Sequence, residues 1–333
     1  MNPGLLVKFR PAAPWRMGPE SGARDRVDLI YHSDSLFSAV TAAMRSLGSQ
    51  DEWLAATAAD AQGSAVRFSS FFPFVGDSPL VAPPRSVWPP PPSAKVRWKS
   101  ARFVPLHVVG SLLAGQALEE DRWNVDGPSE CLIPAGRGGP FRISVRSNAA
   151  VDRLSGHLHT HASACLEFAS GAGLWAAVSF DSEEDYSRWS NPVRAALRLL
   201  ADSGFGGERS RGWGRSEAPE FTDGTFPDLI IPEIPSAHGT EYWLLSLFSP
   251  GVEDAVDWER GSYSVLTRGG RIESPAGSGA KKKLLNMIEE GSVVSAAAPV
   301  HGAAPNVAPD GFPHPVYRAG FAVAIPIPAQ VAA

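Results

Sequence analysis

The stretch SGFGGERSRGWGRSE, residues 203–217, carries five glycines within eleven positions, with Arg209, Arg211 and Arg215 between them. Glycine permits positive φ angles and close approach of the backbone, and successive exposed amides bind anions. Arginine adds bidentate contacts to phosphate. The composition therefore predicts an anion-binding loop, with a mobile, solvated loop as the alternative.

The common nucleotide-binding loops do not fit this stretch. A P-loop links a strand to a helix, whereas residues 203–217 follow a predicted helix and lack the Lys-Ser/Thr pair. The stretch also contains no GxGxxG motif. Chemistry alone therefore leads no further than an anion-binding loop.

The N-terminal part of the chain predicts a strand, a helix and a second strand. The strands are expected at residues 4–10 and 65–76, and the helix is expected to be capped by Ser33 or Asp34 and to end at Gly48. Apolar residues recur through it at helical spacing: Leu36, Phe37, Val40, Met44 and Leu47.

The helix before the glycine-rich stretch is expected to start with Asn191 as its cap and Pro192 at its first position, and to stop at Gly204. Residues 166–180 predict a β-hairpin before it, and residues 216–221 predict a last strand. This order of elements resembles a βαββαβ, or ferredoxin-like, unit.

Residues 83–102, PPRSVWPPPPSAKVRWKSAR, interrupt that order. Four consecutive prolines exclude a regular strand ladder, so an extended insertion is predicted. The segment carries five basic residues and no acid, with Trp88 and Trp98 among them. It could follow a single-stranded nucleic acid by charge and stacking, or dock another subunit.

The C-terminal part follows a proline-punctuated linker at residues 227–236. Strand patterns recur in EYWLLSLFSP, SYSVLTRGGRI and VYRAGFAVAIPI. A second, strand-rich domain is therefore predicted, with a boundary near residue 236.

The composition limits the possible partners. A chain of 333 residues predicts two domains, and a net charge of -5 means that an anionic partner must meet a local basic patch. Cys131 and Cys165 form no CxxC motif, which fits a reducing cytoplasm. We expect neither a signal peptide nor a membrane-spanning segment.

Residues 204–215 are similar to the glycine-rich loop of the RAMP superfamily of CRISPR proteins, G-x-G-G-x-R-S-x-G-x-G-R. Further stretches resemble one Cas5-like branch, the fourth subunit of the type III-A (Csm) effector complex. They are HSDSLFSAV (32–40), FFPFVGDSPLVAPP (71–84), KVRWKSARFVPL (95–106), VRSNAAVDRLSG (145–156), LTRGGRIESP (266–275) and HPVYRAGFAVAIPI (314–327). The resemblance covers nearly the whole chain.

The resemblance implies an α+β fold of two ferredoxin-like (RRM-like) domains. Residues 1–236 would form the first, with a basic, proline-rich insertion at about 83–165 and the glycine-rich loop at 204–215. Residues 237–333 would form the second.

The implied function is that of a non-catalytic RNA-binding subunit that binds the 5′ repeat-derived tag of crRNA, with no cofactor, metal or membrane partner. Its expected protein partners are the large polymerase-like subunit and the backbone RAMP subunit. Target RNA would be met indirectly, through a guide duplex that a thumb-like insertion interrupts. A type III-B counterpart is the alternative.

The expected RNA-binding residues are His32, Ser33, Arg97, Lys99, Arg146, Arg153, Gly204, Phe205, Gly206, Gly207, Arg209, Ser210, Arg211, Gly212, Trp213, Gly214 and Arg215. Loop amides and arginines would hold phosphates, whereas contacts to splayed bases would read the tag sequence. As alternatives, the loop arginines pair with Glu208 or Glu217 on the surface, and Arg153 pairs with Asp152 as a structural clamp.

Two histidine patterns suggest other chemistry. In related RAMP endoribonucleases a histidine of the first domain acts as general acid or base, so a crRNA-processing nuclease using His32 is the rival function. Otherwise His32, Ser33 and Asp34 cap the helix near RNA phosphate. HLHTH, at 157–161, could place three imidazoles on one strand face, but no cysteine or carboxylate stands at a matching spacing, so we expect no metal.

Overall fold

The computed structural model describes residues 2–19, 21–59, 63–90, 98–232, 240–274 and 277–328. The candidate RNA-binding residue Arg97 and the domain boundary near 236 lie outside the described residues. The described chain is a mixed α/β protein in which strands predominate over four α-helices.

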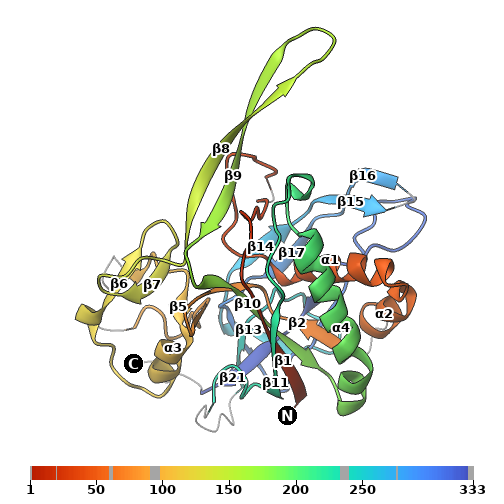
Figure 1. Cartoon of the computed structure of the whole chain (residues 1–333). Coiled ribbons are helices and arrows are strands. Elements are labelled where there is room, and N and C mark those ends of the chain that lie inside the picture. The colour runs from red at the N-terminus through yellow and green to blue at the C-terminus, as the bar shows by residue number, and fades with distance from the viewer. Residues whose placement is uncertain are drawn as a thin grey trace.

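A seven-stranded sheet forms the centre of the N-terminal part (Figure 1). Its strand order is β11-β1-β10-β3-β4-β5, and β2 also pairs with β10. The strands are β1 (Asn2–Phe9), β2 (Val66–Phe68), β3 (Phe72–Val75), β4 (Ser78–Val81), β5 (Val104–Pro105), β10 (Ala172–Phe180) and β11 (Glu220–Phe226). All the pairings are antiparallel.

Two long helices, α1 (Ser33–Ser46) and α4 (Glu183–Ser203), pack against each other and against strands of this sheet. A short helix, α2 (Gln50–Thr57), contacts α1 and places Trp53 edge-on to Trp189 of α4 at 5.4 Å. The buried residues of α4 recur at helical spacing, which gives the helix one apolar face. They include Trp189, Val193, Ala196, Leu197 and Leu200.

The helix starts differ from the sequence prediction. The cap position of α1 is His32, without a side-chain cap, while Ser33 and Asp34 are buried in other contacts. The cap of α4 is Ser182, whose Oγ accepts a hydrogen bond from the Asp185 amide, and Pro192 lies inside the helix. The acidic first turn that follows Ser182 favours this earlier start, because carboxylates stabilise a helix N-terminus.

The insertion between β4 and β10 contains β5 and a group of small elements. These are α3 (Leu106–Leu113), a 3₁₀ turn η2 (Glu120–Arg122), β6 (Trp123–Asp126) and β7 (Cys131–Pro134). Trp98 is 1% exposed and its ring lies 5.6 Å from that of Trp88. Trp98 therefore packs in the core and offers no face for stacking a base.

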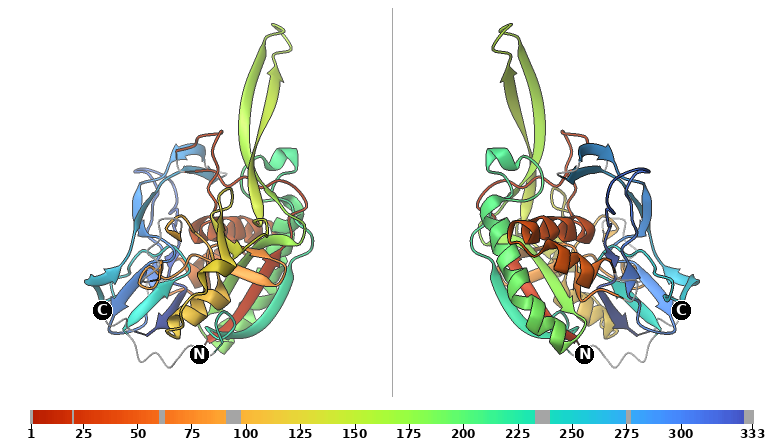
Figure 2. Two further views of the ribbon diagram at one scale, coloured as in Figure 1. Left: turned by 90° about the vertical axis from the view of Figure 1, so that its left-hand side faces the viewer. Right: turned by 90° about the vertical axis from the view of Figure 1, so that its right-hand side faces the viewer.

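A long hairpin follows, formed by β8 (Phe141–Val151) and β9 (Leu158–Phe168), and it projects from the body (Figures 1 and 2). The prediction of a hairpin at 166–180 was wrong, because β9 pairs with β8 whereas β10 pairs with β1, β2 and β3. A local turn signal cannot distinguish a hairpin from two consecutive strands that belong to different sheets.

The C-terminal part is built of strands. Its main sheet has the order β13-β18-β12-β21. The strands are β12 (Glu241–Leu244), β13 (Val256–Ser262), β14 (Val265–Arg268), β15 (Arg271–Ser274), β16 (Gly277–Lys281), β17 (Leu285–Ile288), β18 (Val293–Ala296), β19 (Gly302–Ala303), β20 (Gly320–Phe321) and β21 (Ala324–Ile327).

Residues 240–274 and 277–328 contain no α-helix, so the helices of the ferredoxin-like domain expected at 237–333 are not found there. In their place, strands β14 and β17 pair with each other, as do β15 and β16. The C-terminal half therefore differs from the N-terminal half in how its sheet strands are connected.

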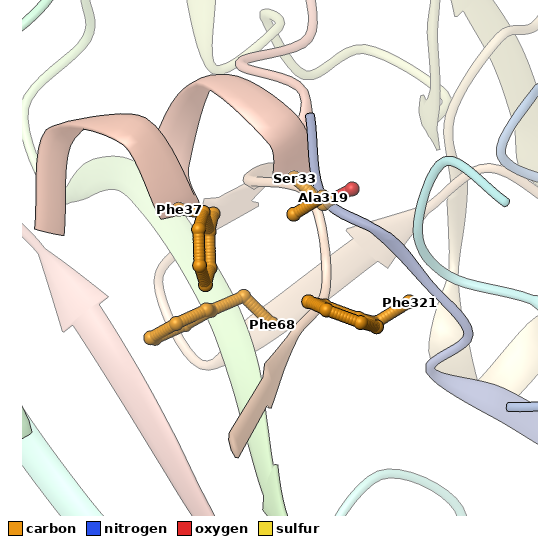
Figure 3. Close-up of a pocket in the computed structure, with 5 residues that line it drawn as sticks. All are labelled: Ser33, Phe37, Phe68, Ala319 and Phe321. Atoms are coloured by element: carbon orange, nitrogen blue, oxygen red, sulfur yellow. The ribbon is translucent and has the colours of Figure 1, made fainter. Parts of the chain in front are cut away.

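The two halves share one apolar core. Figure 3 shows Phe37 of α1, Phe68 of β2 and Phe321 of β20 converging around a cavity of about 10 Å³, too small for a ligand. Nearby, the indole Nε1 of Trp243 in β12 donates a hydrogen bond to the Ala82 carbonyl at 3.0 Å. The halves are thus packed against each other by buried side chains.

Candidate nucleic-acid interface

The glycine-rich loop, residues 204–215, leads from the end of α4 towards β11. Gly204 ends α4 with a φ of 77°, as predicted. A Cβ at this position would lie 2.5 Å from the Trp213 carbonyl oxygen. The conformation and the close contact both explain why glycine stands here.

Phe205 anchors the loop in an aromatic cluster. Its ring lies 4.5 Å from Trp15, 5.1 Å from Tyr31 and 5.7 Å from Phe71, and the residue is 2% exposed. The loop is therefore held against the core, contrary to the mobile alternative. The Phe205 side chain is buried in this structure, and its contact with RNA stays a prediction.

The loop glycines serve close packing of the backbone. A Cβ on Gly206 would meet the Arg16 carbonyl oxygen at 2.6 Å, and one on Gly214 would meet that of Phe205 at 2.1 Å. The Gly207 amide donates to the Arg16 carbonyl at 2.8 Å, and the Gly214 amide donates to the Pro14 carbonyl at 2.9 Å. These amides are therefore not available to an anion, which corrects the expectation that they bind phosphate.

The guanidinium groups of the loop reach the surface. Arg209 lies 3.8 Å from Glu273 of β15, and Arg211 lies 3.1 Å from Glu208 and 3.2 Å from the His161 ring. Ser210 and Arg215 are exposed. For Arg215, no ion pair is found among the described residues. Of the surface pairings considered for these arginines, the one with Glu208 is present through Arg211, whereas Arg209 lies near Glu273, a partner that was not predicted.

The loop contacts the base of the β8–β9 hairpin at two points. The Arg146 guanidinium of β8 lies 5.9 Å from the centre of the Trp213 ring, and Arg211 reaches His161 of β9. Arg146 also pairs with Glu167 at 2.7 Å. Hydrogen bonds from Arg146 and then Arg142 lower the pKa of the Glu167 carboxyl, so it is ionised at neutral pH. Trp213, at 7% exposure, supports this contact and does not offer its ring to RNA.

Two of the predicted RNA-binding residues, Arg153 and Lys99, lie away from the glycine-rich loop. Arg153 is exposed at the far end of the hairpin, and Asp152 accepts hydrogen bonds from the Leu154 amide and the Ser155 hydroxyl. An ion pair between Asp152 and Arg153 is not among those described for the chain. Lys99 is exposed, and no described contact joins it to the loop.

The basic stretch at 85–102 is partly neutralised where it is described. Arg85 pairs with Glu289 at 3.1 Å, and Arg102 lies 3.4 Å from Asp28. These acids come from distant parts of the sequence. The local excess of positive charge that the sequence indicated is therefore reduced by the fold.

His32 is buried between two carboxylates. Its Nδ1–H donates to Glu290 at 2.8 Å and its Nε2–H donates to Asp28 at 3.1 Å, and the residue is 3% exposed. Burial alone would lower the pKa of His32, but the charge of Glu290 and the hydrogen bonds to Asp28 and Glu290 raise it to about 10. His32 is therefore a buried cation whose two ring nitrogens are both engaged, and its contact with RNA stays a prediction.

Ser33 is likewise buried and cannot contact RNA directly. Its amide donates to the Ser70 hydroxyl at 2.8 Å, and its own hydroxyl accepts a hydrogen bond from the Leu247 amide at 3.0 Å. This polar side chain therefore joins the start of α1 to the C-terminal half.

Asp34 forms a buried ion cluster that the sequence reasoning missed. Arg268 donates to both of its oxygens, at 2.8 and 3.0 Å, and Arg318 donates to it as well. Burial alone would raise the pKa of Asp34, but Arg268 and Arg318 lower it to about 2. The three residues stand in three of the stretches that carried the family resemblance, 32–40, 266–275 and 314–327. Their shared role is to connect the two halves.

Of the HLHTH histidines, His157 and His161 belong to no group of potential metal ligands among the described side chains. His161 instead contacts Arg211 across the hairpin base.

Comparison with known proteins shows which proteins this architecture is similar to. Residues 237–327 match the model of the CRISPR Csm4 C-terminal domain. No curated protein matches the chain.

Solved structures match over almost the whole length. One is a chain of the Csm1-Csm4 cassette in complex with cA4, with 18% identity and a TM-score of 0.62, covering 99% of this chain and 100% of that one. Another comes from the Csm3-Csm4 subcomplex in the type III-A CRISPR-Cas interference complex. It has 16% identity and a TM-score of 0.65, and covers 97% of this chain and 99% of that one.

At these identities the solved structures show a common fold. Together with the family match, they confirm the resemblance to the fourth subunit of the type III-A complex, a RAMP protein. None of the described helices is both long and apolar enough to span a membrane.

Proposed function

We propose that this chain is a non-catalytic, RNA-binding subunit of a type III-A CRISPR effector complex, and that it binds the 5′ repeat-derived tag of crRNA. The observation that carries the proposal is the loop at 204–215, which is held against the core, exposes Arg209, Arg211 and Arg215, and meets the β8–β9 hairpin through Arg211 and His161. A loop fixed by Phe205 and by backbone contacts loses little further entropy when its arginines bind phosphate.

The fold supports the proposal. The N-terminal strands β11-β1-β10-β2, with α1 and α4 packed on them, have the order and connections of a ferredoxin-like (RRM-like) unit. The C-terminal sheet β13-β18-β12-β21 repeats this order with strands in place of helices. We assign both sheets to the RAMP type of ferredoxin-like domain.

The proposed protein partners follow from the matched structures, of which one is a Csm1-Csm4 cassette and the other a Csm3-Csm4 subcomplex. We infer that this chain links the large polymerase-like subunit to the backbone RAMP subunit. The projecting β8–β9 hairpin is the candidate thumb that meets the duplex of guide and target RNA, and Leu154 at its far end is 100% exposed.

The rival function, an endoribonuclease that uses His32, is disfavoured by the geometry. A general acid or base must reach the substrate and must change its protonation near the working pH. His32 is 3% exposed, both its ring nitrogens bond carboxylates, and its pKa is raised to about 10.

The test is RNA retention by the complex assembled from this chain, its partner subunits and crRNA. Each phosphate contact to single-stranded RNA contributes a salt slope of about 0.7, so Arg209→Ala combined with Arg215→Ala is expected to weaken retention and reduce the slope by about 1.4. The matched control is Arg188→Ala, an exposed arginine of α4 that lies 3.7 Å from Glu52.

Unchanged retention and slope in the loop variant would overturn the proposal. A loss shared equally by the control would mean that general charge, and not the loop, holds the RNA.

A further inference from the structure

Arg16 is a buried arginine whose guanidinium binds backbone carbonyls. It is 7% exposed, and none of the ion pairs described for the chain includes it. Its Nη1 donates to the carbonyls of Arg24 at 2.8 Å and Arg26 at 3.2 Å, and its Nη2 donates to that of Ala23 at 2.8 Å. In a fourth hydrogen bond, Nη1 donates to the Ala164 carbonyl of β9 at 2.8 Å. One side chain thus fixes residues 21–26, which have no regular secondary structure.

The same residue connects this segment to the glycine-rich loop and to the hairpin. The Arg16 carbonyl accepts the hydrogen bond from the Gly207 amide, and the Ala164 amide donates to the Arg24 carbonyl at 2.8 Å. The segment lies beside the base of the β8–β9 hairpin in Figures 1 and 2. Arg16 therefore connects residues 21–26 to the loop whose arginines we assign to RNA.

The arginine side chains of the segment lie on the surface. Arg24 and Arg26 are exposed, and neither has an ion pair among the described residues. By contrast, Arg146 and Arg211 each contact a carboxylate at 3.1 Å or less. The backbone that carries Arg24 and Arg26 is already ordered by Arg16, so a phosphate bound there would order only the two side chains.

We propose that residues 21–26 form a second wall of the RNA-binding surface, in which Arg24 and Arg26 bind phosphates of single-stranded RNA adjacent to those bound by the glycine-rich loop. Arg16 is the positioning residue of this wall and does not touch the RNA. This inference rests on the function proposed above and extends it to a segment outside the glycine-rich loop.

The experiment uses the assembled complex and labelled crRNA carrying its 5′ tag, with retention measured over a range of salt concentrations. Arg24→Ala combined with Arg26→Ala is expected to lower retention roughly tenfold near physiological salt and to reduce the salt slope by about 1.4, as two lost phosphate contacts require. Normal retention by this variant, together with loss in the Arg209→Ala and Arg215→Ala variant, would overturn the inference and leave the proposed function standing. Normal retention by both variants would overturn the two together.

A second arm tests Arg16. Lysine keeps the charge but lacks the fork that binds several carbonyls, so Arg16→Lys is expected to weaken retention while assembly with the partner subunits continues. Added to the Arg24→Ala and Arg26→Ala variant, it should cause no further loss, because both changes remove the same contacts. Fully additive losses would show that Arg16 acts on RNA binding by another route, against the proposal.

Discussion

Asp34, at the start of α1, accepts two hydrogen bonds from Arg268, which lies 234 residues further along the chain. Both side chains are buried, and Arg318 completes the cluster from a third segment. The Asp34 carboxylate meets the two guanidinium groups only when the N- and C-terminal halves are packed together. The cluster therefore makes correct packing of the halves a condition for a stable interior.

Asp34→Asn is expected to destabilise the chain by about 3–5 kcal/mol, because it leaves two buried guanidinium groups without their shared carboxylate. Denaturant unfolding followed by tryptophan fluorescence measures the change. The control is Asp310→Asn, whose side chain is 95% exposed and pairs with Lys283, and it should change stability by less than about 0.5 kcal/mol. Equal effects of the two substitutions would contradict the structural role of the cluster.

The pH dependence of stability should report His32. Its pKa is raised from 6.5 to about 10 in the folded chain, so its ion pairs contribute fully below about pH 6.5 and are lost as the pH rises towards 10. The stability advantage of the native chain over His32→Gln should shrink in that window, by at most about 1.4 kcal/mol per pH unit. A difference that stays constant from pH 6.5 to 10 would show that His32 is not charged in the folded state.

Two glycines of the loop share the same backbone conformation but differ in their surroundings. Gly212 and Gly214 both have a φ of 79°, yet a Cβ on Gly212 meets nothing within 4 Å, whereas one on Gly214 meets the Phe205 carbonyl at 2.1 Å. Both alanine variants carry strain of about 1–2 kcal/mol. Gly214→Ala should cost about 1–3 kcal/mol more through overpacking and should also weaken crRNA retention.

Unfolding and retention assays on the pair test whether the loop must be packed closely to bind RNA. Equal stability of Gly212→Ala and Gly214→Ala would contradict the close packing. Unequal stability with equal retention would mean that the shape of the loop does not matter for RNA.

Incubation of the purified chain with repeat RNA, without metal ions, should yield no specific cleavage product. The reason is that His32 is buried and engaged by two carboxylates. Gel analysis of wild type beside His32→Gln decides the matter: specific cleavage that the substitution abolishes would restore the nuclease interpretation.

Local signals predicted several elements because their causes are local. The apolar spacing from Leu36 to Met44 gives α1 its buried face, and Gly204 ends α4 with a positive φ angle, as its position predicted. The pattern of the glycine-rich stretch predicted an anion-binding loop at the correct place in the chain, and its binding of RNA stays a prediction. These features depend on neighbours in sequence, so composition and periodicity are sufficient to find them.

Other predictions failed where a distant partner decides the outcome. Residues 166–180 carry a turn signal, but β9 and β10 enter different sheets because their hydrogen-bond partners come from β8 and β1. Phe205 and Trp213 belong to a loop whose composition predicts exposure. In the structure, the aromatic cluster covers Phe205 and Arg146 covers Trp213. Arg16 gave no signal in sequence, because its partners are carbonyls of residues that fold back onto it.

The sequence by itself determined the buried face of α1, the end of α4 at Gly204, where the glycine-rich loop stands and which family the chain resembles, since each depends on patterns along one stretch. Only the tertiary structure decided that His32, Ser33 and Asp34 connect two halves, and that the amides of Gly207 and Gly214 are occupied while the loop arginines remain exposed. The physical reason is that burial and charge pairing are properties of groups brought together by folding. A buried charge must find its partner wherever the chain places one.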